Sequence, residues 1–413
     1  MAEIELPRPQ PLGVFPLPAG YLLVPTGPDH DEARHALVEG RRPATFPPSL
    51  RYYELALDDD LVGAIDTLDA LDATASDDVL AVNRFVLDPS PNALERLRSS
   101  VSGPLAAHVE LVAYAVGLRP VPPDDEHLDG EFAAMAHVAR ATGHLERRDP
   151  AAAIDELESG AQAAHPVSRP LAGQILGQLA NAQLDEGGTQ RASVTFQAAI
   201  DALTGTDLRD SLADLHVTCG AMYQEMSEAA PRLMNTAIEH YLAALNLVNR
   251  DSAPETFAIA NANLGLAYLM SPMNEASDLL RTGIAVQSMR DALTVFTAET
   301  HPDRWSATQL NLANALVYMP STHQAENIAE AIELYEDVLH ARDRHADPQG
   351  RARVLANQGN ALAHLAQFDQ AKARLHEARA IFEEFEEDDA VRTVRSVLDE
   401  IAKQESLLRQ EQV

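Results

Sequence analysis

Apolar residues along most of this chain recur at a spacing of three to four positions, which places them on one face of an α-helix. The pattern comes in pairs: a first helix that ends near a small residue, then a second helix of the type AIxxYxxAL. The first helices are clearest at NANLGLAYLM from Asn261, QLNLANALVYM from Gln309 and LANQGNALAHL from Leu355. Such pairs predict an all-α fold of stacked helical hairpins.

Each second helix begins near a small residue, and another small residue lies late in each first helix. Two helices can cross closely only where the side chains at the crossing are small. Aligning the chain on these positions predicts about six hairpins over residues 130–388. The residues that open the second helices are Ala153, Ala192, Ala237, Ala285, Ala331 and Ala371.

Three middle hairpins have longer loops than the others. Their loops contain EMSEAAPRLMNT, MSPMNEASDLLRTG and MPSTHQAENIA, and each begins near a methionine. Repeated insertions on one side of a helical array often mark its binding edge. Methionines at such sites either form an adaptable binding surface or fill gaps between hairpins. The methionines in question are Met226, Met270, Met273 and Met319.

The segments outside the repeats are predicted to differ from them. Residues 1–48 contain ten of the 25 prolines, which excludes helix and favours an extended arm. The apolar residues Val14, Leu22 and Leu23 indicate that this arm packs on the chain's own helices or on a partner. Residues 49–128 are predicted to form irregular helices, and the Pro- and Asp-rich stretch 119–130 is the best internal boundary.

A last amphipathic helix is predicted over residues 389–413. Its apolar residues fall on one stripe: Val391, Val394, Leu398, Ile401 and Leu408. Helical arrays need a terminal cap with a polar outer face. A cap is therefore the first interpretation of this helix, and a contact between two copies of the chain is the alternative.

The repeat resembles the tetratricopeptide repeat. The pair Leu264-Gly265 followed by Tyr268 fits that family's first helix, and Ala237, Tyr241 and Ala244 fit its second helix. The resemblance covers roughly residues 130–388 and is closest to bacterial arrays with extended hairpins. The Ala-, Arg- and Asp-rich composition is typical of a GC-rich, actinobacterial-like genome. The resemblance implies an α-solenoid whose concave groove binds a segment of another protein.

Asparagines recur on the first helices at two equivalent positions, three residues apart and therefore on one helix face. The resemblance implies that this face lines the groove. An amide side chain can both donate to and accept from a peptide backbone, so the asparagines suit an extended partner segment. The other interpretation is that they bond neighbouring helices. The positions are Asn263, Asn311 and Asn357, and then Asn181, Asn314 and Asn360.

Arg353, one turn before Asn357, is the evident cation near this set and completes the predicted binding residues. Tetratricopeptide arrays that capture a C-terminal carboxylate add paired lysines. The lysines of this chain are Lys372 and Lys403, and neither lies on the asparagine face. Capture of a C-terminal carboxylate is therefore not expected.

The formal net charge is −32, which repels nucleic acid and anionic lipid, since binding to both depends on cations at phosphate. The charge suits a basic partner or simply solvates the surface. No apolar run is long enough to span a membrane. The beginning MAEIELPRPQ lacks the basic and apolar regions of a signal peptide, so we expect a cytoplasmic protein.

Residues with catalytic or metal-binding chemistry do not form a recognised motif. His30 and His35 flank Asp31 and Glu32, and His340 precedes His345, but no HExxH or cysteine cluster is present. The single cysteine, Cys219, lies beside Gly220 in a first helix and is expected to be buried and inert. We therefore expect no metal or cofactor. An enzyme would need convergent titratable groups, most plausibly around His30 to His35.

These observations predict a non-catalytic scaffold or adaptor that binds a partner protein or peptide during assembly, maturation or regulation of a complex. One alternative, by resemblance only, is an accessory or maturation factor of a multisubunit redox enzyme such as a nickel-iron hydrogenase. Another alternative is a regulator that senses a peptide or small ligand.

Overall fold

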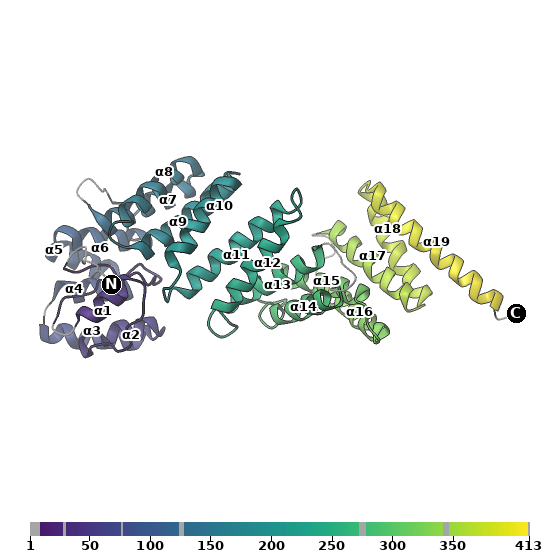
Figure 1. Ribbon diagram of the computed structural model, residues 1–413, viewed down its shortest axis with the longest axis horizontal. Coiled ribbons are helices and arrows are strands. Elements are labelled where there is room, and N and C mark those ends of the chain that lie inside the picture. Colours follow the sequence, from purple (N-terminus) through teal and green to yellow (C-terminus); the bar gives the residue numbers. More distant parts are fainter. Residues whose placement is uncertain are drawn as a thin grey trace. The chain divides into compact units, whose positions relative to one another are not determined.

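The computed structural model describes residues 9–27, 30–75, 77–123, 128–271, 278–341 and 347–411. These residues form the 19 α-helices labelled in Figure 1, and the predicted all-α class is confirmed. The chain divides into two compact units, Met1–Leu215 and His216–Val413. We call them the first and the second unit. In the part of the chain that is described, no helix combines the length and the hydropathy needed to cross a membrane.

The first unit begins with short helices and continues with two hairpins. The short helices, preceded at α2 by the 3₁₀ turn Pro48–Leu50, are α1 (Asp31–Val38), α2 (Arg51–Leu57), α3 (Leu61–Ala75), α4 (Asp78–Leu87), α5 (Pro91–Ser100) and α6 (Gly103–Ala115). The hairpins pair α7 (Gly130–Glu146) with α8 (Pro150–Ala164) and α9 (Arg169–Asp185) with α10 (Thr189–Leu203). Prolines open α5, α8 and α9 in their first turns, where a missing N–H is no loss.

The proline-rich arm packs on the helices of its own unit. It doubles back on itself through the antiparallel bridges Leu12 with Leu23 and Leu17 with Gly20. Leu22, Leu23 and Val24 are fully buried among the helices that follow. Of the two predicted packing surfaces, the structure therefore shows the chain's own helices. The exclusion of helix from residues 1–48 was wrong, because α1 lies within them in a stretch that contains no proline.

Side chains from three helices hold the backbone of this arm. The Asn83 amide accepts from the Leu23 N–H and donates to the Leu23 carbonyl, both at 2.8 Å. His108 Nε2 donates to the Tyr21 carbonyl at 2.8 Å, and Gln174 Nε2 donates to the Val14 carbonyl at 2.8 Å. Because the arm has few backbone partners of its own, these helical side chains satisfy groups that would otherwise be buried unpaired.

The second unit contains four hairpins and a last helix (Figure 1). The division between the units falls within α11 (Arg209–Met226), whose part in the second unit contacts α12 (Leu233–Leu247) through Gly220 and Tyr241. The other helices are α13 (Pro254–Met270), α14 (Asp278–Ala292), α15 (Pro302–Tyr318), α16 (Gln324–Ala341), α17 (Pro348–His364), α18 (Phe368–Glu384) and α19 (Asp388–Glu411). Together with the two hairpins of the first unit, these make the six tetratricopeptide-like hairpins that the repeat predicts.

Small residues let the two helices of each hairpin approach closely, as the sequence predicts. All six alanines that open the second helices are fully buried. A Cβ atom added to Gly220 would lie 2.6 Å from the Tyr241 ring, and one added to Gly359 would lie 2.7 Å from Leu375 Cγ. The glycines therefore make room for the large side chains of the second helices.

The long loops of the middle hairpins are shorter than the sequence analysis predicts. Helix α14 begins at Asp278 and α16 begins at Gln324, so much of each predicted loop belongs to the following helix. Apolar residues at helical spacing, such as Ile328 and Ala331, extend α16 towards its N-terminus. Met273 lies outside the described residues.

Helix α19 packs against α18 along its first half. Val391, Val394 and Ile401 are buried, whereas Leu407 and Leu408 are exposed. The capping and dimerising interpretations of this helix stay predictions, as does the boundary expected at residues 119–130.

Two glycines of the second unit should respond to alanine with opposite signs. Gly220→Ala forces a methyl group against the buried Tyr241 ring and should lower the free energy of unfolding by about 1–3 kcal/mol. Gly283→Ala on α14 meets nothing within 4 Å and should raise it by up to about 1 kcal/mol, since alanine is the better helix former. Denaturant unfolding followed by circular dichroism measures both. Equal effects would show that the hairpin is not packed as described.

His108 should make the first unit less stable in mild acid. Burial lowers the pKa of His108 from 6.5 to about 4, against the opposing effect of its bond to Tyr21. Between these two values the unfolded chain binds the proton and the folded chain does not. The unfolding free energy should therefore fall by about 3 kcal/mol as the pH drops from 6.5 to 4, and level off below that. His108→Gln keeps a donor for Tyr21 but cannot titrate, and should remove this part of the pH dependence.

Candidate protein-interaction surface

Six of the seven predicted binding residues lie on three neighbouring first helices of the second unit. Asn263 lies on α13, and Asn311 and Asn314 lie on α15. The three on α17 are Arg353, Asn357 and Asn360. Helix α15 packs against both α13 and α17, so the predicted binding residues of the three helices form one surface. Asn181 lies on α9 in the first unit and is exposed there.

The asparagines bond to one another and to tyrosines. Asn314 Oδ1 accepts from the Tyr335 hydroxyl at 2.6 Å and from Asn357 Nδ2 at 3.1 Å. Asn360 Nδ2 donates to the Tyr318 hydroxyl at 3.0 Å. These bonds join α17 to α15, and α15 to its own second helix. The amides therefore contribute to the packing of the repeats.

Part of the hydrogen-bonding capacity of the same amides is unused. Within the described residues, Asn314 Nδ2 and the side-chain carbonyls of Asn357 and Asn360 have no partner, and neither has the Asn311 side chain. All four residues are at least partly accessible. Each amide group offers two donors and an acceptor with two lone pairs. The surface therefore presents donors and acceptors side by side, which a passing peptide backbone can use.

Two large side chains on this surface, Tyr318 and His364, were not predicted, whereas Met270 was already named for a possible binding surface. Met270, Tyr318 and His364 each lie five residues after the small residue of their first helix. The Tyr318 side chain is 67% exposed and Met270 is 49% exposed. The His364 ring meets the Tyr318 ring edge-on at 6.4 Å. Their equal spacing from Gly265, Ala313 and Gly359 was the available signal.

We call this surface the amide face. It comprises Asn263, Met270, Asn311, Asn314, Tyr318, Asn357, Asn360 and His364. Although 63 of the 413 residues are acidic, residues 256–270, 304–318 and 348–364 contain no Asp or Glu. The acidic residues of the same hairpins lie mainly on the second helices, as Glu330 and Glu333 do on α16. The amide face is therefore uncharged within a strongly acidic chain, and the basic partner that the net charge suggests has no acidic counterpart on it.

Arg353 lies beside the amide face but is paired. Its guanidinium reaches Glu387 Oε1 at 3.5 Å, and its side chain remains mostly exposed. Exposed ion pairs of this kind are weak, since water screens them. In the first unit the equivalent position on α9 holds Gln174, which binds the arm.

The other residues considered for chemistry are engaged in packing. The His35 ring contacts the Asp31 carbonyl of its own helix at 2.7 Å. Cys219 is buried, which raises the pKa of its thiol to about 12, and it lies 3.5 Å from His240 Nε2. The described residues include no group of three or more His, Cys, Asp or Glu side chains that could hold a metal ion. His345 lies outside these residues.

Comparisons with known proteins find likeness in architecture. No family model and no curated protein matches the chain. Among solved structures, the apo form of RapI matches at 13% identity and a TM-score of 0.46, over 87% of this chain and 97% of RapI. Aspartyl phosphate phosphatase F from Bacillus subtilis matches at 11% identity and a TM-score of 0.40, over 86% and 93%. MamA matches at 18% identity and a TM-score of 0.38, over 51% and 92%.

Two asparagines of the amide face should differ in their effect on stability. Asn314→Ala removes the acceptor of the buried Tyr335 hydroxyl and should lower the free energy of unfolding by about 1–3 kcal/mol. Asn311→Ala removes no bond among the described residues and should change it by less than about 0.5 kcal/mol. Parallel denaturant curves test this difference. Equal curves would show that the Tyr335 bond does not form in solution.

Proposed function

We propose that the second unit is a protein-interaction module that holds an extended, uncharged segment of a partner protein on the amide face. The observation that carries this proposal is the row of accessible amides and exposed Tyr318 on three neighbouring helices, in stretches (256–270, 304–318 and 348–364) that contain no carboxylate. Tyrosine and asparagine are side chains that interfaces use for rigid contact area and adaptable hydrogen bonding.

The chain itself contains a precedent for the proposed chemistry. In the first unit, Asn83 binds both backbone groups of one arm residue, Leu23, through its acceptor and its donor, and Gln174 binds the Val14 carbonyl. Amide side chains on helices thus bind the backbone of an extended segment within this chain. The amide face offers the same groups in a row, and part of their hydrogen-bonding capacity has no partner among the described residues.

The charge distribution supports an uncharged ligand. A basic segment would find no carboxylate on the amide face and would be attracted to the second helices instead. An acidic segment would be repelled by the net charge of −32. A neutral segment is neither drawn to the second helices nor repelled by the net charge. Such a module would act in the assembly, maturation or regulation of a complex.

A photo-crosslinking residue at position 318 should capture a partner in cells of the native host. Position 280 provides a matched control, because Leu280 on the second helix α14 is 69% exposed and lies outside the amide face. We expect a crosslinked partner at position 318 and none at position 280. Mass spectrometry should place the crosslink within a segment that has few charged residues.

Affinity for the captured segment provides the quantitative test. Tyr318→Ala should raise the dissociation constant at least about tenfold, since aromatic residues at interfaces are frequent hot spots. Raising the salt concentration from about 0.1 to 1 M should change it by less than about threefold, because no charge pair is involved. A steep loss of affinity with salt, or equal affinity of the Tyr318→Ala variant, would contradict the proposal.

A further inference from the structure

A serine and a histidine of the first unit form a short hydrogen bond. Ser49 lies in the turn that precedes α2, and its Oγ is 2.6 Å from Nε2 of His30. His30 lies at the position that caps α1, and its other ring nitrogen, Nδ1, is 3.2 Å from the Pro25 carbonyl. A nucleophile bonded to a base, with the base oriented by a third group, is the arrangement found in activated serines.

The direction of both bonds follows from the groups involved. A carbonyl oxygen can only accept, so Nδ1 of His30 carries the proton that it donates to Pro25. In the neutral ring Nε2 is then an acceptor, and the Ser49 hydroxyl donates to it. His30 therefore presents its basic nitrogen to the proton that Ser49 must lose to become a nucleophile.

The histidine ring is held rigidly in this orientation. His30 is 4% exposed. A Cβ atom added to Gly27 would lie 2.4 Å from the His30 ring. The backbone at Gly27 therefore packs so closely on the ring that no larger residue fits there without a shift. Because both ring nitrogens are bonded and the ring is enclosed, His30 has little freedom to turn away from Ser49.

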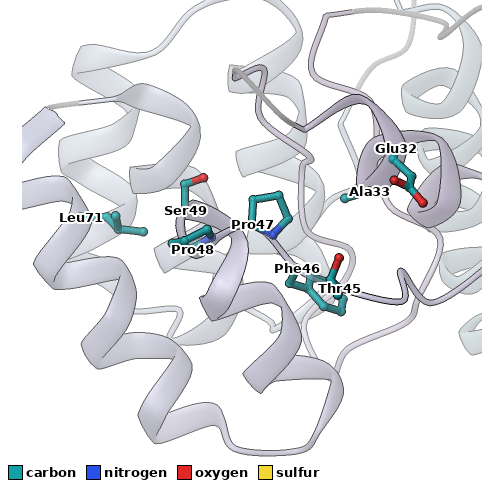
Figure 2. Close-up of a pocket in the computed structure, with 8 residues that line it drawn as sticks. All are labelled: Glu32, Ala33, Thr45, Phe46, Pro47, Pro48, Ser49 and Leu71. Carbon is teal, nitrogen blue, oxygen red and sulfur yellow. The ribbon is translucent and has the colours of Figure 1, made fainter.

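Ser49 also lines an open cavity of about 570 Å³. Figure 2 shows its hydroxyl beside the rings of Pro47 and Pro48, with Glu32 and Thr45 on the other side of the pocket in this view. The volume is sufficient for a small organic ligand. Glu32 places a carboxylate at the wall, which disfavours an anionic ligand.

We propose that Ser49 is a nucleophilic serine that accepts an acyl group from a small, uncharged activated ester bound in this cavity. Ser49 Oγ forms a bond to the ester carbonyl carbon while its proton passes to His30 Nε2. The bond between that carbon and the leaving oxygen then breaks, and the leaving oxygen takes the proton from His30. The products are an acylated Ser49 and an alcohol or phenol, with no change in oxidation state.

Acetylation of the full chain by 4-nitrophenyl acetate tests the proposal. Intact-mass measurement counts the acetyl groups, and peptide mapping at successive times gives the rate at each serine. Ser90 is the internal control, since it is half-buried like Ser49 and its hydroxyl serves a helix cap without a histidine. We expect Ser49 to react at least about 100-fold faster than Ser90, the contribution expected of a positioned base.

Two variants identify the base. Ser49→Ala should abolish the fast acetylation. His30→Gln should slow it about 100-fold, because glutamine can accept a hydrogen bond from the Ser49 hydroxyl but cannot take its proton. Ser90→Ala should leave it unchanged. Reaction of Ser49 no faster than Ser90 in the unaltered chain would overturn the proposal and leave the pair as a brace between α1 and the turn. This comparison does not require either variant to fold.

Discussion

Close approach of paired helices is the constraint on which the repeat architecture depends. In three hairpins a large side chain on the second helix, such as Tyr241 or Leu375, fills space that exists only because the facing residue is glycine. The opening alanines of the second helices are buried at the same crossings. The hairpins are therefore specified less by their apolar content, which is common to helical proteins, than by where side chains are missing.

This constraint explains why the fold could be predicted from the sequence. A small residue at a fixed place in each helix leaves a visible period, and the helical spacing of apolar residues supplies the rest. The lengths of the middle loops were harder to predict, since a polar helix start such as QAENIA looks like a loop until its buried Ile328 is known. The surface on which the arm packs could not be predicted either. Its apolar residues predicted burial, but Asn83, His108 and Gln174, which hold it, come from distant helices and follow no local motif.

The amide face was predicted in part. The asparagines follow the repeat period, so their common surface could be expected, but their bonds to Tyr335 and Tyr318 depend on side-chain geometry. The absence of acidic residues from the three first helices beyond their first turns is visible in the sequence once the helix bounds are known. His30 was named as a candidate, but no motif pairs it with Ser49, because the orientation of its ring depends on the turn at Gly27 and on the burial of the ring.

The arm also has a consequence for how the chain is made. It is translated before α9, yet Val14 and Tyr21 are bonded to Gln174, some 150 to 160 positions later. The apolar residues of the arm pack with helices that are synthesised before α9, whereas the bonds to Gln174 require a loop of that length to close. The arm can therefore bury its leucines and valines before it completes its hydrogen bonds. Its prolines, which oppose regular helix and sheet, favour the extended backbone that these late bonds need.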